Sequence, residues 1–425
     1  CVKPNAPPDA ADYIKPSQLC IGLHVHLDLS WTEHPFAFSN FKIKSLDQVA
    51  TIQGLGLERV RYSPGKSDCT PLAATTETPV PRMPAGASAH PALAEKRSQR
   101  DRLQAHRERV AACERELAAH VRIAQAMERN LLSKPEAVRQ NAANLVDSMA
   151  GSLLMDADVT VHLMSDTVGD ERLHMHNLNV AVLALILGRE LKLSAGMLHT
   201  VGMGAMFHDI GLAELPARLR APGKDRTPQE LQAYQQHCDG GTAMAARMNL
   251  APEIVQVITQ HHEHTDGSGY PRRLKNQMIS RAAQLVAIAD QFDELCNPPA
   301  PAEALTPHEA LSMMYGQQRN RFDLTALMTF VRCVGIYPPG TLVALSNGAL
   351  GMVLSVNSSR PLKPTVVIHD PAVQKSEAIV VELEREQDVS IARALRPQQL
   401  TREQSDYLSP RNRMAYYFSS ESKAA

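Results

Sequence analysis

The sequence has few aromatic residues and no apolar run long enough to span a membrane. Aromatic side chains make up 4% of the 425 residues. The apolar residues are mostly Ala, Leu, Val and Met, a composition that favours helices. The longest apolar run, residues 180–187, is far shorter than the roughly 20 residues that a membrane-spanning helix needs. We therefore expect a mainly helical protein without a membrane span.

Closely spaced cysteines and a strong net charge are also missing. The seven cysteines are scattered and form no Cys-x-x-Cys pair, which is typical of a reducing compartment and predicts a cytoplasmic protein. The formal net charge is -1 and the sequence pI is about 7.1. Such a balance gives no basis for electrostatic binding of nucleic acid, and none is predicted.

The first part of the chain predicts a small domain followed by a linker. Residues 12–62 read as a small α+β domain with strands near 19–29, 38–43 and 58–62 and a helix over 45–55. Residues 63–91 are rich in proline and nearly devoid of large apolar side chains. Because such a stretch cannot bury enough surface to fold, it is predicted to be a linker.

A long polar helix is predicted for residues 92–134. Apolar residues recur every seven positions from Leu103 to Leu131, and a second row begins at His106. A heptad pattern of this kind predicts a coiled coil, and hence a homodimer through residues 92–131. A single amphipathic helix that packs on its own domain explains the pattern equally well.

The remainder of the chain predicts a helical core and a small C-terminal β-subdomain. Residues 135–335 read as successive helices, one of them starting at Thr227, where Thr-Pro-Gln-Glu provides an N-cap and a capping glutamate. Within residues 336–390, Ser346-Asn347-Gly348 lies between alternating apolar stretches and predicts a hairpin. Residues 391–425 are interpreted as a polar tail that is disordered after about residue 400.

The most informative motif is His-His-Glu-His-Thr-Asp-Gly-Ser-Gly-Tyr-Pro at residues 261–271. Imidazole is the commonest metal ligand among side chains, and the glycines force a tight turn. By itself the histidine pair is better explained by a polar surface loop after a helix. Other histidines and aspartates in the helical region favour a metal site instead. They are His176, His208, Asp209, His237 and Asp290. Together with the motif, they offer more ligands than one ion requires. The set suits two octahedral first-row transition metals that share a bridging water or hydroxide.

Together these motifs resemble those of the HD-GYP family, a subset of the HD metal-dependent phosphohydrolases. The resemblance rests on His208-Asp209-Ile210-Gly211, on residues 261–271, and on residues 288–293, and it covers roughly residues 170–330. Residues 31–36 also resemble part of a small domain of unknown function that often precedes HD-GYP domains. The resemblance implies an all-helical HD-type core that hydrolyses cyclic di-GMP to linear pGpG and, in some members, GMP, in bacterial second-messenger signalling.

The resemblance also assigns roles to the site residues. One metal would be held by His176, His208, Asp209 and Asp290. The other would be held by His237, His261 and His262, with Asp209 as the bridge. A metal-bound hydroxide between the two ions would attack phosphorus, and His208 and Asp209 would be the catalytic residues. Iron or manganese is the implied metal. The turn is expected to form a lip for substrate or partner, built by Asp266, Gly267, Gly269, Tyr270 and Pro271.

Three positions depart from the family pattern. Leu212 replaces the usual lysine of the His-Asp motif, and residues 297–300 lack the usual arginines, so two cationic phosphate contacts are missing. Arg172 stands where members with three metals carry glutamate, which predicts two metals here. Arg172 reads either as a phosphate ligand or as an ion-pair partner of Glu171.

Two functions from different classes follow. The favoured one is a metal-dependent cyclic di-GMP phosphodiesterase. The alternative is a weakly active or inactive metal-bound module that senses the nucleotide or recruits signalling proteins through the turn at residues 267–271. A weaker third possibility is an HD phosphohydrolase that acts on another nucleotide.

Overall fold

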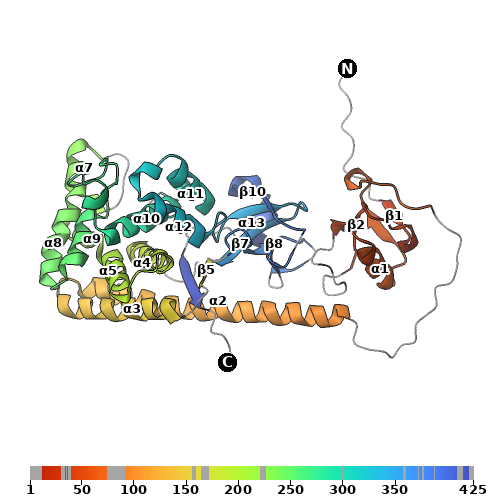
Figure 1. Ribbon diagram of the computed structural model, residues 1–425, viewed down its shortest axis with the longest axis horizontal. Coiled ribbons are helices and arrows are strands. Elements are labelled where there is room, and N and C mark those ends of the chain that lie inside the picture. Colours follow the sequence, from red (N-terminus) through yellow and green to blue (C-terminus); the bar gives the residue numbers. More distant parts are fainter. Residues whose placement is uncertain are drawn as a thin grey trace, which may run out of the picture. The chain divides into compact units, whose positions relative to one another are not determined.

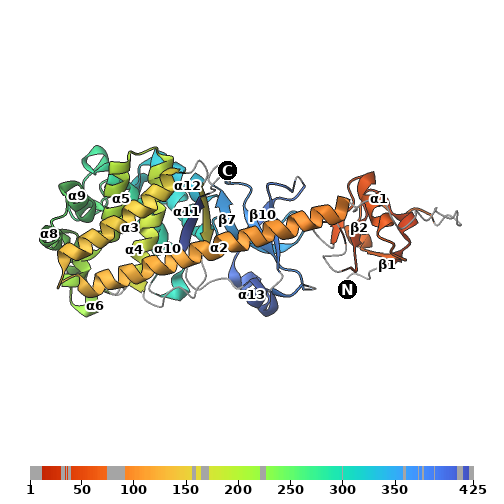
Figure 2. The same cartoon turned by 90° about the horizontal axis from the view of Figure 1, so that it is seen from below.

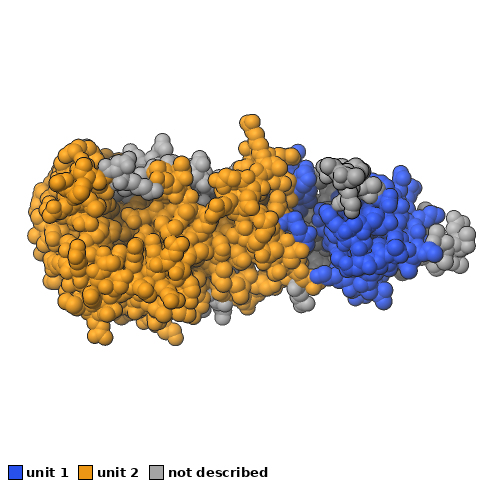
Figure 3. Space-filling model, turned by 90° about the horizontal axis from the view of Figure 1, so that it is seen from above, with its two compact units in different colours: residues 1–106, 347–349, 370–381 blue, residues 107–346, 350–369, 382–425 orange. Residues whose placement is uncertain are grey.

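The computed structural model divides the chain into two compact units, which Figure 3 colours separately. One unit comprises residues 1–106, 347–349 and 370–381, and the other comprises residues 107–346, 350–369 and 382–425. The structure describes residues 12–29, 34, 36, 40–73, 91–155, 159–163, 172–220, 226–298, 300–357, 360–371, 373–375, 378–386, 388–408 and 415–420.

The first unit contains a four-stranded antiparallel sheet with the strand order β1-β4-β2-β3. Its elements are β1 (Asp12–Ile14), β2 (His24–His26), β3 (Asn40–Lys42), α1 (Leu46–Gly54) and β4 (Val60–Tyr62). Ser45 caps α1 by accepting a hydrogen bond from the backbone N–H of Gln48. Leu23, Val25 and Ile52 are fully buried at the centre of this unit. The predicted helix and the two later strands are confirmed, whereas β1 was not foreseen.

The small unit continues beyond the predicted boundary at residue 62. The Leu72 N–H donates to the Gln18 carbonyl at 2.9 Å, and Ser67 Oγ accepts from the His24 N–H at 2.9 Å. The segment predicted as the start of the linker is therefore held by backbone hydrogen bonds, which composition does not reveal. Residues 74–90 of the predicted linker lie outside the described residues, as does Trp31.

The long helix predicted after the linker is α2 (Pro91–Asn130), and α3 (Pro135–Met155) runs beside it (Figure 2). The described side chains of the heptad rows turn toward the helix's own unit, where Cys113, Leu117, Ala124 and Met127 are buried in its core. This stretch therefore packs as a single amphipathic helix. The side chains of residues 92–107, which carry the first part of the predicted dimer seam, lie outside the described part.

The helical core surrounds α4 (Arg172–Glu190), whose residues Val180–Leu187 are at most 1% exposed. Figure 1 shows α5 (Ala195–Phe207), α9 (Pro252–Gln260) and α10 (Arg281–Cys296) grouped with it. The other helices of this core are α6 (Ala217–Arg220), α7 (Pro228–Gln235), α8 (His237–Arg247), α11 (Pro307–Gly316) and α12 (Leu324–Val334). Thr227 caps α7 with the predicted capping box. None of the helices that the structure describes is long and apolar enough to cross a membrane.

The C-terminal part forms a seven-stranded sheet in which β10-β6-β7-β5-β11 are neighbours and β8 and β9 continue from β7. Its strands are β5 (Val159–Leu163), β6 (Leu342–Leu345), β7 (Leu350–Asn357), β8 (Thr365–Ile368), β9 (Ile379–Glu382), β10 (Ile391–Leu395) and β11 (Tyr416–Ser420). The predicted hairpin is confirmed as β6 and β7. β5 is a strand within the region that was predicted to contain only helices.

The prediction that the residues after about 400 in the polar tail are disordered was wrong. Residues 391–425 contribute β10, β11 and the helix α13 (Arg402–Leu408). Tyr416, Tyr417 and Phe418 are at most 4% exposed. β11 pairs antiparallel with β5, so Tyr416 lies opposite Leu163. These aromatic residues lie in a strand whose pairing partner is far away in the sequence. The polar residues around them therefore made the segment look disordered.

Candidate metal centre

Five segments of the helical core bring the predicted site residues together, mostly at helix ends. His208 and Asp209 follow the last residue of α5, His237 begins α8, and His261 and His262 follow α9. His176 and Asp290 lie within α4 and α10. A ligand at a helix end is held by a rigid element while its side chain can still turn toward its neighbours.

The clustered side chains form two groups that share one carboxylate. Asp209, His237, His261 and His262 offer ligand atoms within 4.8 Å of one another, and His176, His208 and Asp209 do the same. Asp290 lies beside both groups. Its Oδ1 is 3.1 Å from His176 Nε2, and its Oδ2 is 3.7 Å from His262 Nδ1. All seven predicted ligands therefore lie at one place, with Asp209 between two sets of imidazoles.

Three of the imidazoles are oriented by the backbone of their own helical turn. The Nδ1 atoms of His208, His237 and His261 lie 2.7, 2.7 and 2.8 Å from the carbonyls of Ala205, Tyr234 and Ile258, each three residues earlier. A carbonyl can only accept, so each Nδ1 carries the proton and each Nε2 presents a lone pair. In metal sites, a histidine that binds the metal through one ring nitrogen commonly donates a hydrogen bond from the other, which fixes the orientation of the ring.

The electron pairs that face one another at the centre call for a cation. His237 Nε2 lies 3.3 Å from both His261 Nε2 and Asp209 Oδ1. Asp209 Oδ1 is buried, and no hydrogen-bond partner for it occurs among the described residues. A buried carboxylate oxygen without a donor is costly unless a positive charge balances it. The residues present thus fit divalent metal ions, and the cluster can hold them.

Burial and neighbouring charges act on the cluster in opposite directions. Burial lowers the pKa of His237 to about 4, which favours the neutral imidazole that binds metal. Burial alone would raise the pKa of Asp209, but the adjoining histidines His208, His261 and His237 hold it below its ordinary value. Asp209 is therefore ionised, as a bridging ligand must be.

Two residues that sequence reasoning did not assign complete the surroundings of His176. Asp293 Oδ2 lies 2.7 Å from His176 Nδ1, and Asp293 Oδ1 accepts hydrogen bonds of 2.8 Å from Asn179 and Asn297. Although burial lowers the pKa of His176, Asp290 and Asp293 together raise it above its ordinary value. Spacing gave a signal, because Asp293 and Asn179 each follow a predicted ligand by three residues and so share its helix face.

The turn at residues 266–271 is built against the cluster. Glu263, which is 2% exposed, accepts hydrogen bonds from the backbone N–H groups of Arg272 and Leu274 at 2.6 and 2.8 Å. The Tyr270 N–H donates to the His262 carbonyl at 3.0 Å, and the two rings lie 4.7 Å apart. The Tyr270–Pro271 peptide bond is cis. The tyrosine of the lip is therefore in contact with a predicted metal ligand.

Gly269 and Gly267 are required in the turn for different physical reasons. A Cβ on Gly269 would lie 2.4 Å from both the His262 carbonyl oxygen and the His264 nitrogen, so only glycine fits there. Gly267 has a φ of +81°, a conformation that favours glycine. Asp266 Oδ1 accepts from the Ser268 N–H at 2.8 Å and so closes the turn. Asp266, Gly267 and Gly269 shape the lip.

The comparisons with known proteins agree with this geometry. Residues 162–326 match the HD domain, residues 13–146 match a domain of unknown function (DUF3391), and residues 342–403 match a KOW domain associated with HD domain. The chain is 30% identical over 368 residues to the cyclic di-GMP phosphodiesterase PA4108 of Pseudomonas aeruginosa. The matched region covers 84% of this chain and 85% of that protein. The chain belongs to the HD-GYP family.

Other relatives share a smaller part of the chain or a lower identity. A cyclic di-GMP phosphodiesterase of Thermotoga maritima is 32% identical over 152 residues, or 34% of this chain and 41% of that protein. Among solved structures, the HDGYP protein Bd1817 of Bdellovibrio bacteriovorus is 13% identical and covers 76% of this chain and 98% of that one. The TM-score between the two structures is 0.40.

The positions at which this HD-GYP protein departs from the family pattern lie in different surroundings. Leu212 is 5% exposed in the 3-10 turn Ile210–Glu214 after Asp209. Asn297 donates to Asp293 and so supports His176 indirectly. Arg172 begins α4, and its side chain lies outside the described residues.

One cationic side chain near the cluster was not foreseen. The guanidinium of Arg226 lies 3.8 Å from the centre of the Tyr234 ring, and that ring is 4.9 Å from the ring of His237. Burial raises the pKa of Tyr234, and the charges of Asp209 and Asp290 raise it further. The charge of Arg226 lowers it. No sequence motif marks Arg226. Its contact with Tyr234 depends on how the chain folds at the start of α7.

Proposed function

We propose that this chain is a metal-dependent phosphodiesterase that hydrolyses cyclic di-GMP to linear pGpG, GMP or both. The carrying observation is that Asp209 lies between two groups of histidines whose Nε2 atoms point inward. A shared carboxylate and separate imidazole sets are what a pair of metal ions requires. A relative over most of the chain and another over about a third of it (34%) are named cyclic di-GMP phosphodiesterases, which supports the substrate.

The assignment of ligands follows the two groups. His176, His208 and Asp290 would hold one metal, His237, His261 and His262 would hold the other, and Asp209 would bridge them. Iron or manganese suits a nitrogen-rich, carboxylate-bridged set. Such a pair of cations lowers the pKa of water and neutralises negative charge that develops on a phosphoryl group. His208 and Asp209 are the catalytic residues in this proposal, since they sit where the two groups meet.

The protein's own groups supply orientation and shielding. The backbone carbonyls of Ala205, Tyr234 and Ile258 fix the imidazoles, so the ligand lone pairs need no rearrangement when metal binds. Tyr270 covers His262 and gives the lip an aromatic face suited to a guanine base.

The substrate's phosphates would meet Arg226 in place of the family's lysine. Leu212 offers no donor, whereas Arg226 carries a permanent charge. Its guanidinium lies over the Tyr234 ring, which is tilted against the ring of His237, and donates one hydrogen bond to the Leu219 carbonyl at 3.0 Å. A guanidinium binds phosphate oxygens through two parallel hydrogen bonds. We propose that this side chain compensates in part for the missing cations, and that their loss weakens substrate binding rather than metal binding.

The assay that tests the function uses the full chain loaded anaerobically with Fe(II) or Mn(II). Cyclic di-GMP is added and the products are separated by chromatography. We expect linear pGpG or GMP from the wild type and none from Asp209→Ala, and a metal content near two per chain. Asp239→Ala is the matched control, since Asp239 is an exposed acid on α8 outside the cluster.

Absence of linear product above the Asp209→Ala background contradicts the enzyme. Binding of cyclic di-GMP without turnover would instead favour the metal-bound signalling module, and turnover of another nucleotide only would favour a different HD phosphohydrolase. One or three metals per chain contradicts the two-metal assignment. Light scattering tests the remaining partner proposal, a homodimer through residues 92–131, and a monomer would remove it.

A further inference from the structure

The C-terminal strand β11 reaches the metal centre through a chain of hydrogen bonds. The backbone N–H of Tyr416 donates to Asn179 Oδ1 at 3.2 Å, and Asn179 Nδ2 donates to Asp293 Oδ1 at 2.8 Å. Asp293 Oδ2 in turn lies 2.7 Å from His176 Nδ1. Tyr416, Asn179 and Asp293 are at most 2% exposed, so water does not replace these contacts.

The order of donors and acceptors along this chain is fixed by its first member. A backbone N–H can only donate, so it selects the oxygen of the Asn179 amide. The amide nitrogen must then point at Asp293, where it occupies Oδ1. The remaining oxygen, Oδ2, is left for the Nδ1–H of His176, and His176 Nε2 faces Asp290 and His208.

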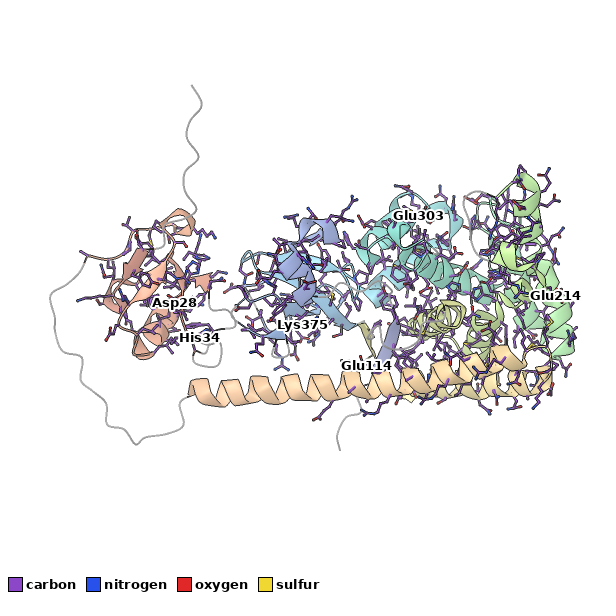
Figure 4. The ribbon with its side chains drawn as sticks, turned by 180° about the vertical axis from the view of Figure 1, so that it is seen from behind. Asp28, His34, Glu114, Glu214, Glu303 and Lys375 are labelled. Carbon is purple, nitrogen blue, oxygen red and sulfur yellow. The ribbon has the colours of Figure 1, made fainter. Side chains whose placement is uncertain are left out.

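The position of β11 is itself determined by two other elements. It pairs with all five residues of β5, from Val159 to Leu163. It also contacts α2, because Cys113 Sγ donates to the Phe418 carbonyl at 3.4 Å and the Tyr417 hydroxyl lies 3.0 Å from His120 Nδ1. Figure 4 labels Glu114 on this stretch of α2.

We infer that β11 is a positioning element of the metal centre, which holds His176 as a metal ligand through Asn179 and Asp293. The inference rests on the proposed metal-dependent function and adds to it that a strand at positions 416–420 sets one ligand's tautomer. Asn179 and Asp293 touch no substrate in this proposal, so they are positioning residues. Loss of such partners of metal ligands typically costs about 10- to 100-fold in metal affinity.

The test compares Asn179→Leu with wild type in the full chain, using Mn(II) titration and metal analysis after dialysis. Asn179→Leu is expected to retain one tightly bound metal per chain and to bind the second about 10- to 100-fold more weakly. Asn130→Leu is the matched control, since the hydrogen bond that its amide makes among the described residues goes to the Ala126 carbonyl of its own helix. It is expected to hold two metals like the wild type.

Thermal unfolding of the metal-free variants separates positioning from folding. If Asn179→Leu loses both metals together with its melting transition, the residue is structural and the inference is overturned. Asn179→Asp, which can still accept from Tyr416 but repels Asp293, must also weaken one metal. Two metals retained with wild-type affinity in both variants overturns the inference while leaving the proposed function intact. A wild type without metal defeats the proposed function itself.

A separate observation concerns two thiols in the small unit. Cys20 Sγ lies 3.2 Å from Cys69 Sγ, and both side chains are partly exposed. The Cys69 thiol also donates to the Ile21 carbonyl at 3.1 Å. A disulfide has a sulfur–sulfur length of about 2.05 Å, so closing the gap needs a movement of about 1 Å. The other described cysteines, which are Cys113, Cys238, Cys296 and Cys333, are buried.

We propose that Cys20 and Cys69 form a reversible disulfide with a small-molecule disulfide as oxidant. One thiolate attacks the oxidant and releases one thiol. The second thiolate then attacks the mixed disulfide, forms the Cys20–Cys69 bond and releases a second thiol, so that two thiols are oxidised and one disulfide is reduced. The bond would clamp the segment at residues 67–72 to the turn at residues 20–22.

Peptide mapping after incubation of the full chain with oxidised glutathione tests the proposal. We expect a linked Cys20–Cys69 peptide that dithiothreitol releases, and a glutathione adduct on Cys20 in Cys69→Ser. Cys333→Ser is the control, in which the linked peptide must persist. Stable glutathione adducts on both cysteines of the wild type, or no modification of either, overturns the proposal.

Discussion

Asp293 Oδ2 and His176 Nδ1 are 2.7 Å apart, and the Asp293 side chain is 1% exposed. This carboxylate is also the acceptor for the amides of Asn179 and Asn297. Three donors, of which Asn179 is buried and His176 and Asn297 are partly buried, therefore depend on one side chain that the sequence motif does not assign to metal. The hydrogen bonds that support the predicted ligand His176 therefore converge on this one carboxylate.

Replacing Asp293 by alanine is expected to destabilise the metal-free protein. The change leaves His176, Asn179 and Asn297 without their acceptor, and each buried unsatisfied donor costs about 1–3 kcal/mol. We expect the free energy of unfolding in urea to fall by about 3 kcal/mol or more. Asp293→Asn keeps one acceptor oxygen and should lose less. An Asp293→Ala protein as stable as the wild type would contradict the assigned contacts.

Gly269→Ala is expected to disrupt the lip and the ligand beside it. The added Cβ would overlap the backbone at His262 and His264, neither of which can move without shifting a predicted ligand. Metal affinity should therefore fall together with activity, and stability should drop by about 1–3 kcal/mol. Gly240→Ala in α8 is the matched control, because its Cβ would meet nothing closer than 3.7 Å. Equal behaviour of the two variants would rule out the close-approach argument.

The small unit should lose stability in acid through His26. Burial, followed by the charge of Arg61, lowers the pKa of His26 from 6.5 to about 4, and the ring lies 2.8 Å from Ser63 Oγ. Between these pH values the unfolded state binds more protons than the folded state. The contribution is therefore fully present above pH 6.5 and is lost as the pH falls through about 4.

Urea unfolding between pH 7 and pH 4.5 measures this effect, with fluorescence of the chain's one tryptophan, Trp31, as the probe. His26→Gln should show a shallower dependence on pH than the wild type. His199→Gln, a change in the other unit, should leave the dependence unaltered. The same slope in wild type and His26→Gln would mean that this histidine does not titrate as described.

Arg226→Ala is expected to weaken substrate binding with little effect on metal content. A charged hydrogen bond to phosphate contributes about 1.5–3 kcal/mol, so KM should rise about 10-fold or more. Arg218→Ala is the control, since Arg218 is 71% exposed and pairs with Glu230. Steady-state kinetics with cyclic di-GMP separates KM from kcat. A fall in kcat at unchanged KM would place Arg226 in another role.

The sequence by itself picked out the seven side chains that the structure brings together. It could do so because the motifs are local: an adjacent His-Asp or His-His pair at a helix end carries its chemistry in the residue types alone. The capped helix at Thr227 and the hairpin at residues 346–348 were predictable for the same reason, since caps and turns depend on neighbours in the chain.

Only the tertiary structure decided how those ligands are supported. The pairing of Tyr416 with Leu163, the hydrogen bond from Tyr416 to Asn179 and the stacking of Arg226 on Tyr234 are invisible in composition or periodicity. The first two join residues more than 200 positions apart. A segment that looks polar and disordered becomes a buried strand when a distant edge strand pairs with its backbone. Non-local pairing of this kind, rather than local propensity, sets the fate of the C-terminal residues.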